Sequence, residues 1–270
     1  MKRRAFTLIE LLTVIAIIAI LAAMLVPVIS IAEVRAKKAQ AKLETQNIVN
    51  AIGAYEADYS RFPISSSANA LGMEEITYGG TFQTPTGPWL VGSTNTVNNQ
   101  VFTTNSDVIA ILLDYTNYLN GYSPGVAPDN SATTTWTVNA NHQSNPKRTV
   151  YLSSTKQVNW DPTMGGTPQP GIGNDLVYRD PWGNPYVITM DLDEDNFTSD
   201  AFYGGAKVST TTGNAGDPGL YGLTYHTEGS SSSYAFHGNV MVWSAGPDGR
   251  IDPKSAANQG YNKDNVLSWQ

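Results

Sequence analysis

The chain has 270 residues, with 16 Lys and Arg against 23 Asp and Glu, a formal net charge of −7, and no cysteine. The lack of cysteine excludes disulfides and thiolate metal sites, and the acidic balance argues against a nucleic-acid partner. Charged residues make up only 14% of the chain, and Gly and Pro are frequent. This composition is typical of a β-rich, loop-rich domain outside the cytoplasm.

The first predicted element is a long helix with an apolar N-terminal half. A Lys-Arg-Arg triplet precedes Ala5, and residues 6–31 then contain Glu10 as their one charged residue. Such a run is long enough to span a bilayer, which needs about 20 apolar residues. The cations predict that this end stays in the cytoplasm and that the rest of the chain is exported.

Glu10 is unusual, because an ionised carboxylate in a spanning helix costs about 2.5–3.5 kcal/mol on insertion scales. Cleavage between Ala5 and Phe6 would create an α-amino group four residues before Glu10, about 6 Å along the helix axis. The same ammonium group on an axially staggered copy of the chain could neutralise Glu10. Alternatively, Glu10 lies in the headgroup zone of the membrane.

Two other processing schemes fit the N-terminal segment less well. A secretory signal could be cleaved after residues 30–32, Ser-Ile-Ala, but its apolar core is normally 7–15 residues and this run is longer and contains Glu10. A plain membrane anchor would need the same length of helix and no Glu10.

The junction Lys-Arg-Arg-Ala followed by Phe-Thr-Leu-Ile-Glu, residues 2–10, resembles the class III leader and N-terminal segment of type IV pilins and type II secretion pseudopilins. The resemblance implies cleavage by a prepilin peptidase before Phe6, N-methylation of Phe6, and packing of N-terminal helices into a filament core with Glu10 facing a neighbour's amine. Members of these families usually have Gly where this chain has Ala5. Residues 1–5 would then be the leader and residues 6–31 the transmembrane and filament-core helix.

Residues 32–62 are predicted to continue the helix as an amphipathic segment that lies on a globular domain of residues 63–270. Pro27 lacks an amide hydrogen and should weaken or kink the helix locally. In the resembled families a proline here marks a stretch that melts on filament assembly; the alternative is a tolerated transmembrane proline. The helix should end before Pro63.

The globular domain is predicted to hold few helices. Residues 64–105 favour a long loop with one short strand near residues 88–91, and residues 106–121 a short amphipathic helix capped by Ser106 and Asp107. Strands are expected at residues 149–160, 176–178, 185–191, 220–227 and 234–244. These elements predict an α+β fold class, and the resemblance implies a pilin-like fold, a long N-terminal helix packed on a small antiparallel sheet, with long insertions at residues 64–146 and 192–227.

Two C-terminal motifs sharpen the resemblance. Residues 180–186, Asp-Pro-Trp-Gly-Asn-Pro-Tyr, form a turn that delivers aromatic side chains into a strand, and they resemble the signature that opens the C-terminal sheet of the major, G-type pseudopilin of type II secretion. That pseudopilin ends in a Gly-rich, Asp-containing loop that binds calcium. The corresponding residues here would be Asp248 and either Asp264 or Asn265, with Asp252 nearby, and such oxygens suit Ca²⁺. The alternative is a surface turn without metal.

Other motifs predict little chemistry. Asp191, Asp193 and Asp195 begin like an EF-hand loop but lack its later Gly and Glu, so a solvated acidic loop is expected. The three histidines lie in unrelated segments, which predicts no zinc site. No nucleophile elbow, Walker loop or dinucleotide fingerprint is present, and the protein is not expected to be an enzyme.

The resemblance implies a structural subunit of a type II secretion pseudopilus, a helical homopolymer that drives protein export. It would sit in the inner membrane with a periplasmic domain, with minor pseudopilins, an inner-membrane assembly platform and the prepilin peptidase as partners. One alternative is a type IV pilin or minor pilin with adhesive loops. Another is a membrane-anchored exported binding domain that does not polymerise.

Overall fold

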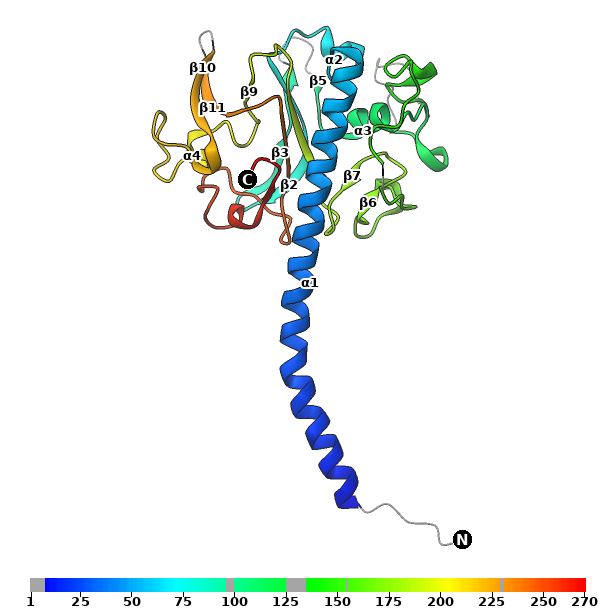
Figure 1. The fold of residues 1–270 in the computed structure, drawn as a ribbon, viewed down its shortest axis with the longest axis vertical. Helices are drawn as coiled ribbons and strands as arrows, with labels where there is room; N and C mark the ends of the chain where they lie inside the picture. The colour runs from blue at the N-terminus through cyan, green and yellow to red at the C-terminus, as the bar shows by residue number, and fades with distance from the viewer. Residues whose placement is uncertain (1–7, 96–99, 125–134, 154, 229–230) are drawn as a thin grey trace.

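The computed structural model describes residues 8–95, 100–124, 135–153, 155–228 and 231–270, and one long helix dominates it (Figure 1). Helix α1 (Leu8–Tyr59) has 52 residues and is about 78 Å long at 1.5 Å per residue. Its N-terminal half projects from the globular body, and its C-terminal half lies along that body. The predicted α+β class, a long N-terminal helix followed by small antiparallel sheets, is confirmed.

The helix is unbroken through Pro27 and ends at Tyr59, three residues before the predicted end at residue 62. Ser60 stops it, because this residue adopts a φ of 51°, in the left-handed region. The amide of Ser60 still donates to the carbonyl of Glu56 at 2.7 Å. The end of the helix is therefore set by a left-handed turn residue rather than by the conformational restriction before Pro63.

The remaining elements are short. The other helices are α2 (Ser66–Asn69), α3 (Ser106–Leu112) and α4 (Ala206–Ser209). The strands are β1 (Glu75–Tyr78), β2 (Gly80–Thr84), β3 (Gly87–Val91), β4 (Thr94–Asn95), β5 (Gln100–Val101), β6 (Gly171–Ile172), β7 (Tyr178–Arg179), β8 (Val187–Asp191), β9 (Phe197–Thr198), β10 (Thr224–Glu228), β11 (Ser231–His237), β12 (Val240–Ser244) and β13 (Val266–Leu267).

The central sheet is antiparallel, with strand order β1-β8-β12-β13. A three-stranded sheet, β10-β11-β9, lies beside it, and strand pairs β2-β3, β4-β5 and β6-β7 complete the body. Helix α1 packs along β12 and β13. The C-terminal strand is therefore an edge strand of the central sheet, in contact with the helix.

The central sheet is buried on both faces, and alternate residues enter two cores. On β12, Val242 belongs to the core between the sheet and α1, which also contains Ile52 and Tyr55 of the helix. Met241 and Trp243 point into a second core behind the sheet. Each fully buried aliphatic or aromatic side chain contributes about 1.5–3 kcal/mol. The hydrophobic stripe of α1 and the inner face of the sheet thus stabilise each other.

Several strand predictions need correction. The described residues of the stretch 149–160, which are 149–153 and 155–160, form no strand, and among them only Gln157 makes an isolated bridge, to Ile172. The predicted strand at residues 234–244 is two strands, β11 and β12, because Gly238 turns the chain with a φ of 158°. Residues 64–105, predicted to be a loop with one short strand, contain α2, β1, β2, β4 and β5 in addition to the expected β3.

Helix α3 also differs from its prediction. It ends at Leu112 instead of continuing to residue 121, and Leu119–Gly121 is a separate 3-10 turn in which Asn120 is left-handed, with a φ of 50°. The N-cap is Asn105 rather than Ser106 or Asp107. The amide of Asn105 is turned away from the helix toward the sheet, so the expected side-chain cap is absent from this helix.

Candidate functional site

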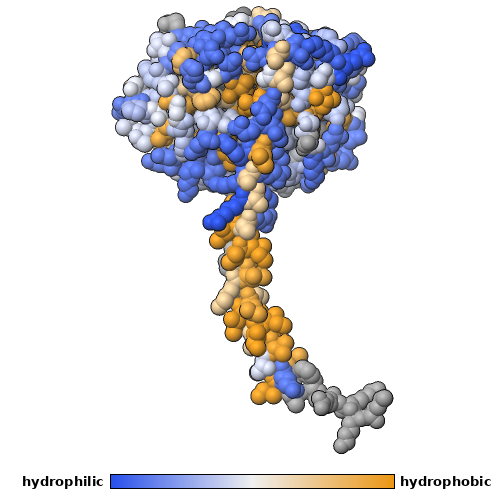
Figure 2. Space-filling view, viewed as in Figure 1, coloured by the Kyte–Doolittle hydropathy of each residue, from blue (hydrophilic) through white to orange (hydrophobic). Residues whose placement is uncertain are grey.

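The apolar half of α1 is an exposed surface. Apolar side chains from Leu8 to Ile31 are exposed, for example Leu8 at 83% and Leu25 at 61%. Figure 2 shows this part of the helix as a hydrophobic column attached to a largely hydrophilic body. Within the described residues, α1 is the one helix long and apolar enough to cross a membrane. This surface requires a bilayer or neighbouring helices to cover it.

Glu10 lies on this column, in the first turn of α1, and its side chain is exposed. Its backbone carbonyl accepts a hydrogen bond from the Thr13 hydroxyl at 3.0 Å. The carboxylate therefore faces the environment that surrounds the apolar helix. The predicted processing residues, Ala5 and Phe6, lie outside the described residues.

The turn at residues 180–186 is organised by Asp180, which is fully buried. One carboxylate oxygen accepts from the amides of Trp182 and Asn184, both at 2.9 Å. The other accepts from the hydroxyl of Ser244 at 2.6 Å, and the side-chain amide of Asn184 donates to the carbonyl of Gly246 at 3.1 Å. The two C-terminal motifs seen in the sequence are thus joined by direct hydrogen bonds.

The same turn is tied to α1 and α3. The Tyr186 hydroxyl donates to the Glu44 carboxylate on α1 at 2.5 Å. The Asn105 amide donates to the carbonyls of Tyr178 and Tyr186 at 3.0 and 2.8 Å. The sequence analysis did not predict this role of Asn105. The available signal was its place directly before a predicted helix, where a polar side chain usually makes hydrogen bonds to the backbone.

The C-terminal segment is held by α1. The Lys42 ammonium group donates to the carbonyls of Leu267 and Ser268 at 2.6 and 3.2 Å, and Gln46 also donates to the Ser268 carbonyl. Across the sheet, the amide of Val242 donates to the Ser268 hydroxyl at 3.0 Å. Asp264 and Asn265 therefore directly precede a segment that α1 holds in place.

The four predicted calcium ligands fall into two groups. Asp264 Oδ1 and Asn265 Oδ1 are buried and make no hydrogen bond within the described structure. Asp248 is exposed and lies near Asp264. The pKa of Asp264 is raised, first by its own burial and then by the negative charge of Asp248. Asp252 instead caps its own turn, accepting from the Lys254 amide at 2.9 Å and the Ser255 hydroxyl at 2.7 Å.

Buried oxygens without donors fit a cation, because an unsatisfied acceptor costs about 1–3 kcal/mol and Ca²⁺ takes carboxylate, amide and carbonyl oxygens. The loop approaches closely: a Cβ on Gly246 would collide with the Asp264 carbonyl. Within the described residues, however, Asp248, Asp252 and Asp264 do not join any set of three carboxylates or imidazoles whose ligand atoms lie within 4.8 Å of one another. The fit therefore rests on Asp264, Asn265 and Asp248.

These elements define a pilin-like fold, in which a long N-terminal helix carries a small antiparallel α+β domain. Residues 1–26 match the family described as the prokaryotic N-terminal methylation motif. No curated protein and no solved structure matches the chain. The motif and the apolar helix together indicate a membrane-anchored, exported protein with a type IV pilin-like prepilin signal.

Proposed function

We propose that this chain is a structural subunit of a type II secretion pseudopilus, closest to the major, G-type pseudopilin. The observation that carries the proposal is the exposed apolar half of α1, which begins in a methylation motif and extends beyond the globular body. Such a helix can leave the bilayer only if other helices cover it. Prepilin peptidase, minor pseudopilins and an inner-membrane assembly platform are the partners of this role.

The G-type assignment is supported by the hydrogen bonds between the two C-terminal motifs. Asp180 connects the turn at residues 180–186 to Ser244, and Lys42 holds the end of the chain against α1. This arrangement couples the C-terminal loop to the filament helix. We also propose that the loop binds Ca²⁺ through Asp264, Asn265 and Asp248, with Asp252 shaping the turn beside them.

Glu10→Ala tests polymerisation. A filament subunit needs Glu10 for incorporation, so the variant should accumulate as membrane-inserted monomer at normal abundance while filaments fail to form. Glu33→Ala is the matched control, because Glu33 is also an exposed acid on α1 and makes only an i,i+4 ion pair with Lys37, at 3.0 Å, which is worth about 0.3–0.5 kcal/mol. Unchanged filament assembly in Glu10→Ala would refute the role of Glu10 in subunit pairing. A parent chain that forms no filament would favour the anchored domain that does not polymerise.

A second candidate function is a type IV pilin or minor pilin with adhesive loops. It is favoured by the size of the insertions, which place α2, α3 and the strand pairs β2-β3 and β4-β5 around the central sheet. Deleting the gene separates the two functions. Loss of an exported protein from the medium, with no filament outside the cell in the parent strain, supports the pseudopilus; loss of extracellular filaments supports the pilin.

A further inference from the structure

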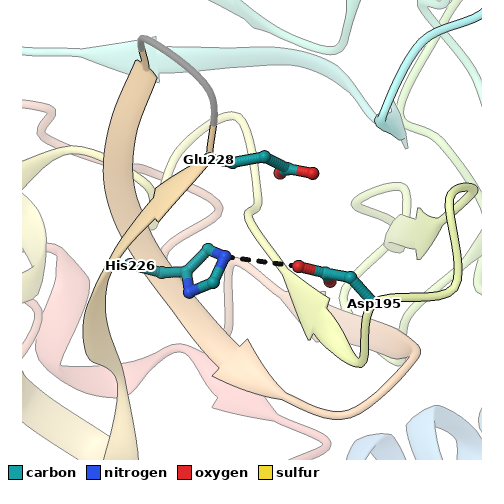
Figure 3. Close-up of side chains that lie close together, drawn as sticks. All are labelled: Asp195, His226 and Glu228. Carbon is teal, nitrogen blue, oxygen red and sulfur yellow. Dashed lines mark ion pairs between the residues drawn. The ribbon is translucent and has the colours of Figure 1, made fainter.

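A cluster of possible metal ligands lies on the three-stranded sheet, far from the N-terminal half of α1 (Figure 1). It consists of Asp195, His226 and Glu228, which we call the tip cluster. Each residue offers one ligand atom, and the three atoms lie within 4.8 Å of one another. Figure 3 shows the imidazole and the two carboxylates gathered between β10 and the turn before β9. His226 Nε2 is 3.2 Å from Asp195 Oδ2.

The backbone explains this convergence. His226 and Glu228 are two residues apart on β10 and therefore point to the same face of the sheet. Strand β9 pairs with the far side of β11, with His237 opposite Phe197, which brings the turn between β8 and β9 to that sheet. Asp195 Oδ1 accepts from the Phe197 amide at 2.7 Å, leaving Oδ2 directed at His226.

The imidazole of His226 is held in a fixed plane. The ring of Phe197 stacks on it with centroids 4.1 Å apart and an interplanar angle of 12°. His237 packs against the same Phe197 ring edge-on, at 5.1 Å. A ring oriented in this way presents Nε2 to the carboxylates without a further loss of side-chain freedom, which is what a preorganised ligand requires.

The surroundings of the tip cluster are strongly acidic. Glu228 also belongs to a ligand set with Glu74 and Glu75, and Asp195 to one with Asp191 and Asp193. Across the described residues, His226 is the one basic group within 4.0 Å of any of these six carboxylates. Crowded carboxylates of this kind favour a bound cation.

We propose that Asp195, His226 and Glu228 bind one divalent transition-metal ion of the Zn²⁺ class. An imidazole nitrogen with two carboxylate oxygens is a ligand set for Zn²⁺, whereas Ca²⁺ takes oxygen ligands. The ion would fasten the β10–β11 hairpin to the turn before β9 at the end of the domain remote from the membrane helix. This inference does not depend on the proposed function.

The test is isothermal titration of the detergent-solubilised full chain, purified without a histidine tag and freed of metal, with Zn²⁺ and separately with Ca²⁺. One Zn²⁺ should bind per chain. His226→Gln, Glu228→Gln and Asp195→Asn should each weaken it by at least about tenfold, since even partners outside the metal's own ligands cost 10–100-fold. Asp195→Asn keeps the acceptor for the Phe197 amide and so preserves the turn.

His237→Gln is the matched control. This residue touches the same phenyl ring but offers no ligand to the tip cluster, so Zn²⁺ affinity should stay unchanged. Near-ultraviolet circular dichroism establishes that each variant is folded. No Zn²⁺ binding to the parent chain, or Zn²⁺ binding of equal strength in His226→Gln, overturns the proposal. A competition with Ca²⁺ gives a further test, and the Asp248→Asn variant is included because it weakens the separate proposed calcium loop. If Ca²⁺ displaces Zn²⁺ to the same extent in the parent chain and in Asp248→Asn, the proposal is also overturned, because the site would then behave as an oxygen-only site.

Discussion

The calcium proposal gives a prediction whose size follows from the structure. Asp264 Oδ1 and Asn265 Oδ1 are buried acceptors without donors, and each costs the native state about 1–3 kcal/mol. A cation could therefore recover about 2–6 kcal/mol. Mass action gives a compatible figure, because a ligand at one hundred times its Kd stabilises the folded state by about 2.7 kcal/mol.

That free energy corresponds to a measurable thermal shift. In a domain of about 150–250 residues, 1 kcal/mol moves Tm by about 2–4 °C, so saturating calcium should raise Tm by about 5–11 °C. The assay is thermal unfolding of the full chain in detergent, in millimolar CaCl₂ and in chelator at equal ionic strength. The near-ultraviolet signal is informative, because Tyr203 packs against both Trp243 and Trp269 and accepts a hydrogen bond from Asn265 at 2.8 Å.

Asp248→Asn should have two opposite effects. It removes the charge that contributes to the raised pKa of Asp264, so the metal-free protein should become slightly more stable, by under about 1 kcal/mol because Asp248 is exposed to solvent. The calcium shift should shrink sharply. The asparagine still offers an oxygen to the Arg250 amide, which Asp248 now caps at 2.9 Å, so the turn is kept.

Asp252→Asn is the matched comparison. Because both Asp252 oxygens already accept hydrogen bonds within their own turn, we expect this variant to keep most of the calcium shift. The reasoning fails if calcium moves Tm by less than the experimental error in the parent protein. It fails equally if Asp248→Asn retains the full shift, since the loop would then be a plain turn.

Three further predictions concern processing, pH and the C-terminal contact with α1. Mass spectrometry of the mature N-terminal peptide should find N-methylated Phe6, and a start at Glu33 would contradict the pilin-like processing. Burial raises the pKa of Asp180 to about 6 from 3.8, so the folded state binds this proton more tightly than the unfolded state. The contribution of Asp180 to the free energy of unfolding is fully present below about pH 4 and is lost, by up to about 3 kcal/mol, as pH rises through 6. Urea unfolding across this range should show this decrease in the parent chain and not in Asp180→Asn. Lys42→Met should cost about 1–3 kcal/mol in the same assay, whereas equal loss in the surface control Lys37→Met would show that the C-terminal hydrogen bonds contribute nothing.

Local sequence determined the helix and the two C-terminal turns. The continuous apolar run and the amphipathic stripe that includes Ile48, Ile52 and Tyr55 are properties of one long segment, and these three side chains are buried against the sheet. The turn at residues 180–186 was also readable, because Gly183 adopts a φ of 95° and Asp180 bonds to amides only two and four residues away. Interactions of short range need no knowledge of the rest of the fold.

Pairing between distant segments was decided by the tertiary structure. The stretch 149–160 has a strand-like composition, but its described residues pair with another segment only through the isolated bridge from Gln157 to Ile172. In contrast, β1, in a stretch expected to be mostly loop, is an outer strand of the central sheet because Ile76 lies opposite Met190. A strand is stabilised by its neighbours' hydrogen bonds and side chains. The residues of a segment therefore indicate that it can form a strand, and whether it does so depends on a neighbouring strand with which it can pair.

The same distinction applies to the sites. The sequence placed Glu10 on the apolar helix and Asp264 and Asn265 near the chain end, because each position follows from a local motif. It predicted no zinc site, since spacing along the chain cannot show that His226 meets Asp195. That meeting depends on the register of β9 and β10 with β11, and register is fixed by the burial of whole strand faces against the core, which exists only after the chain has folded.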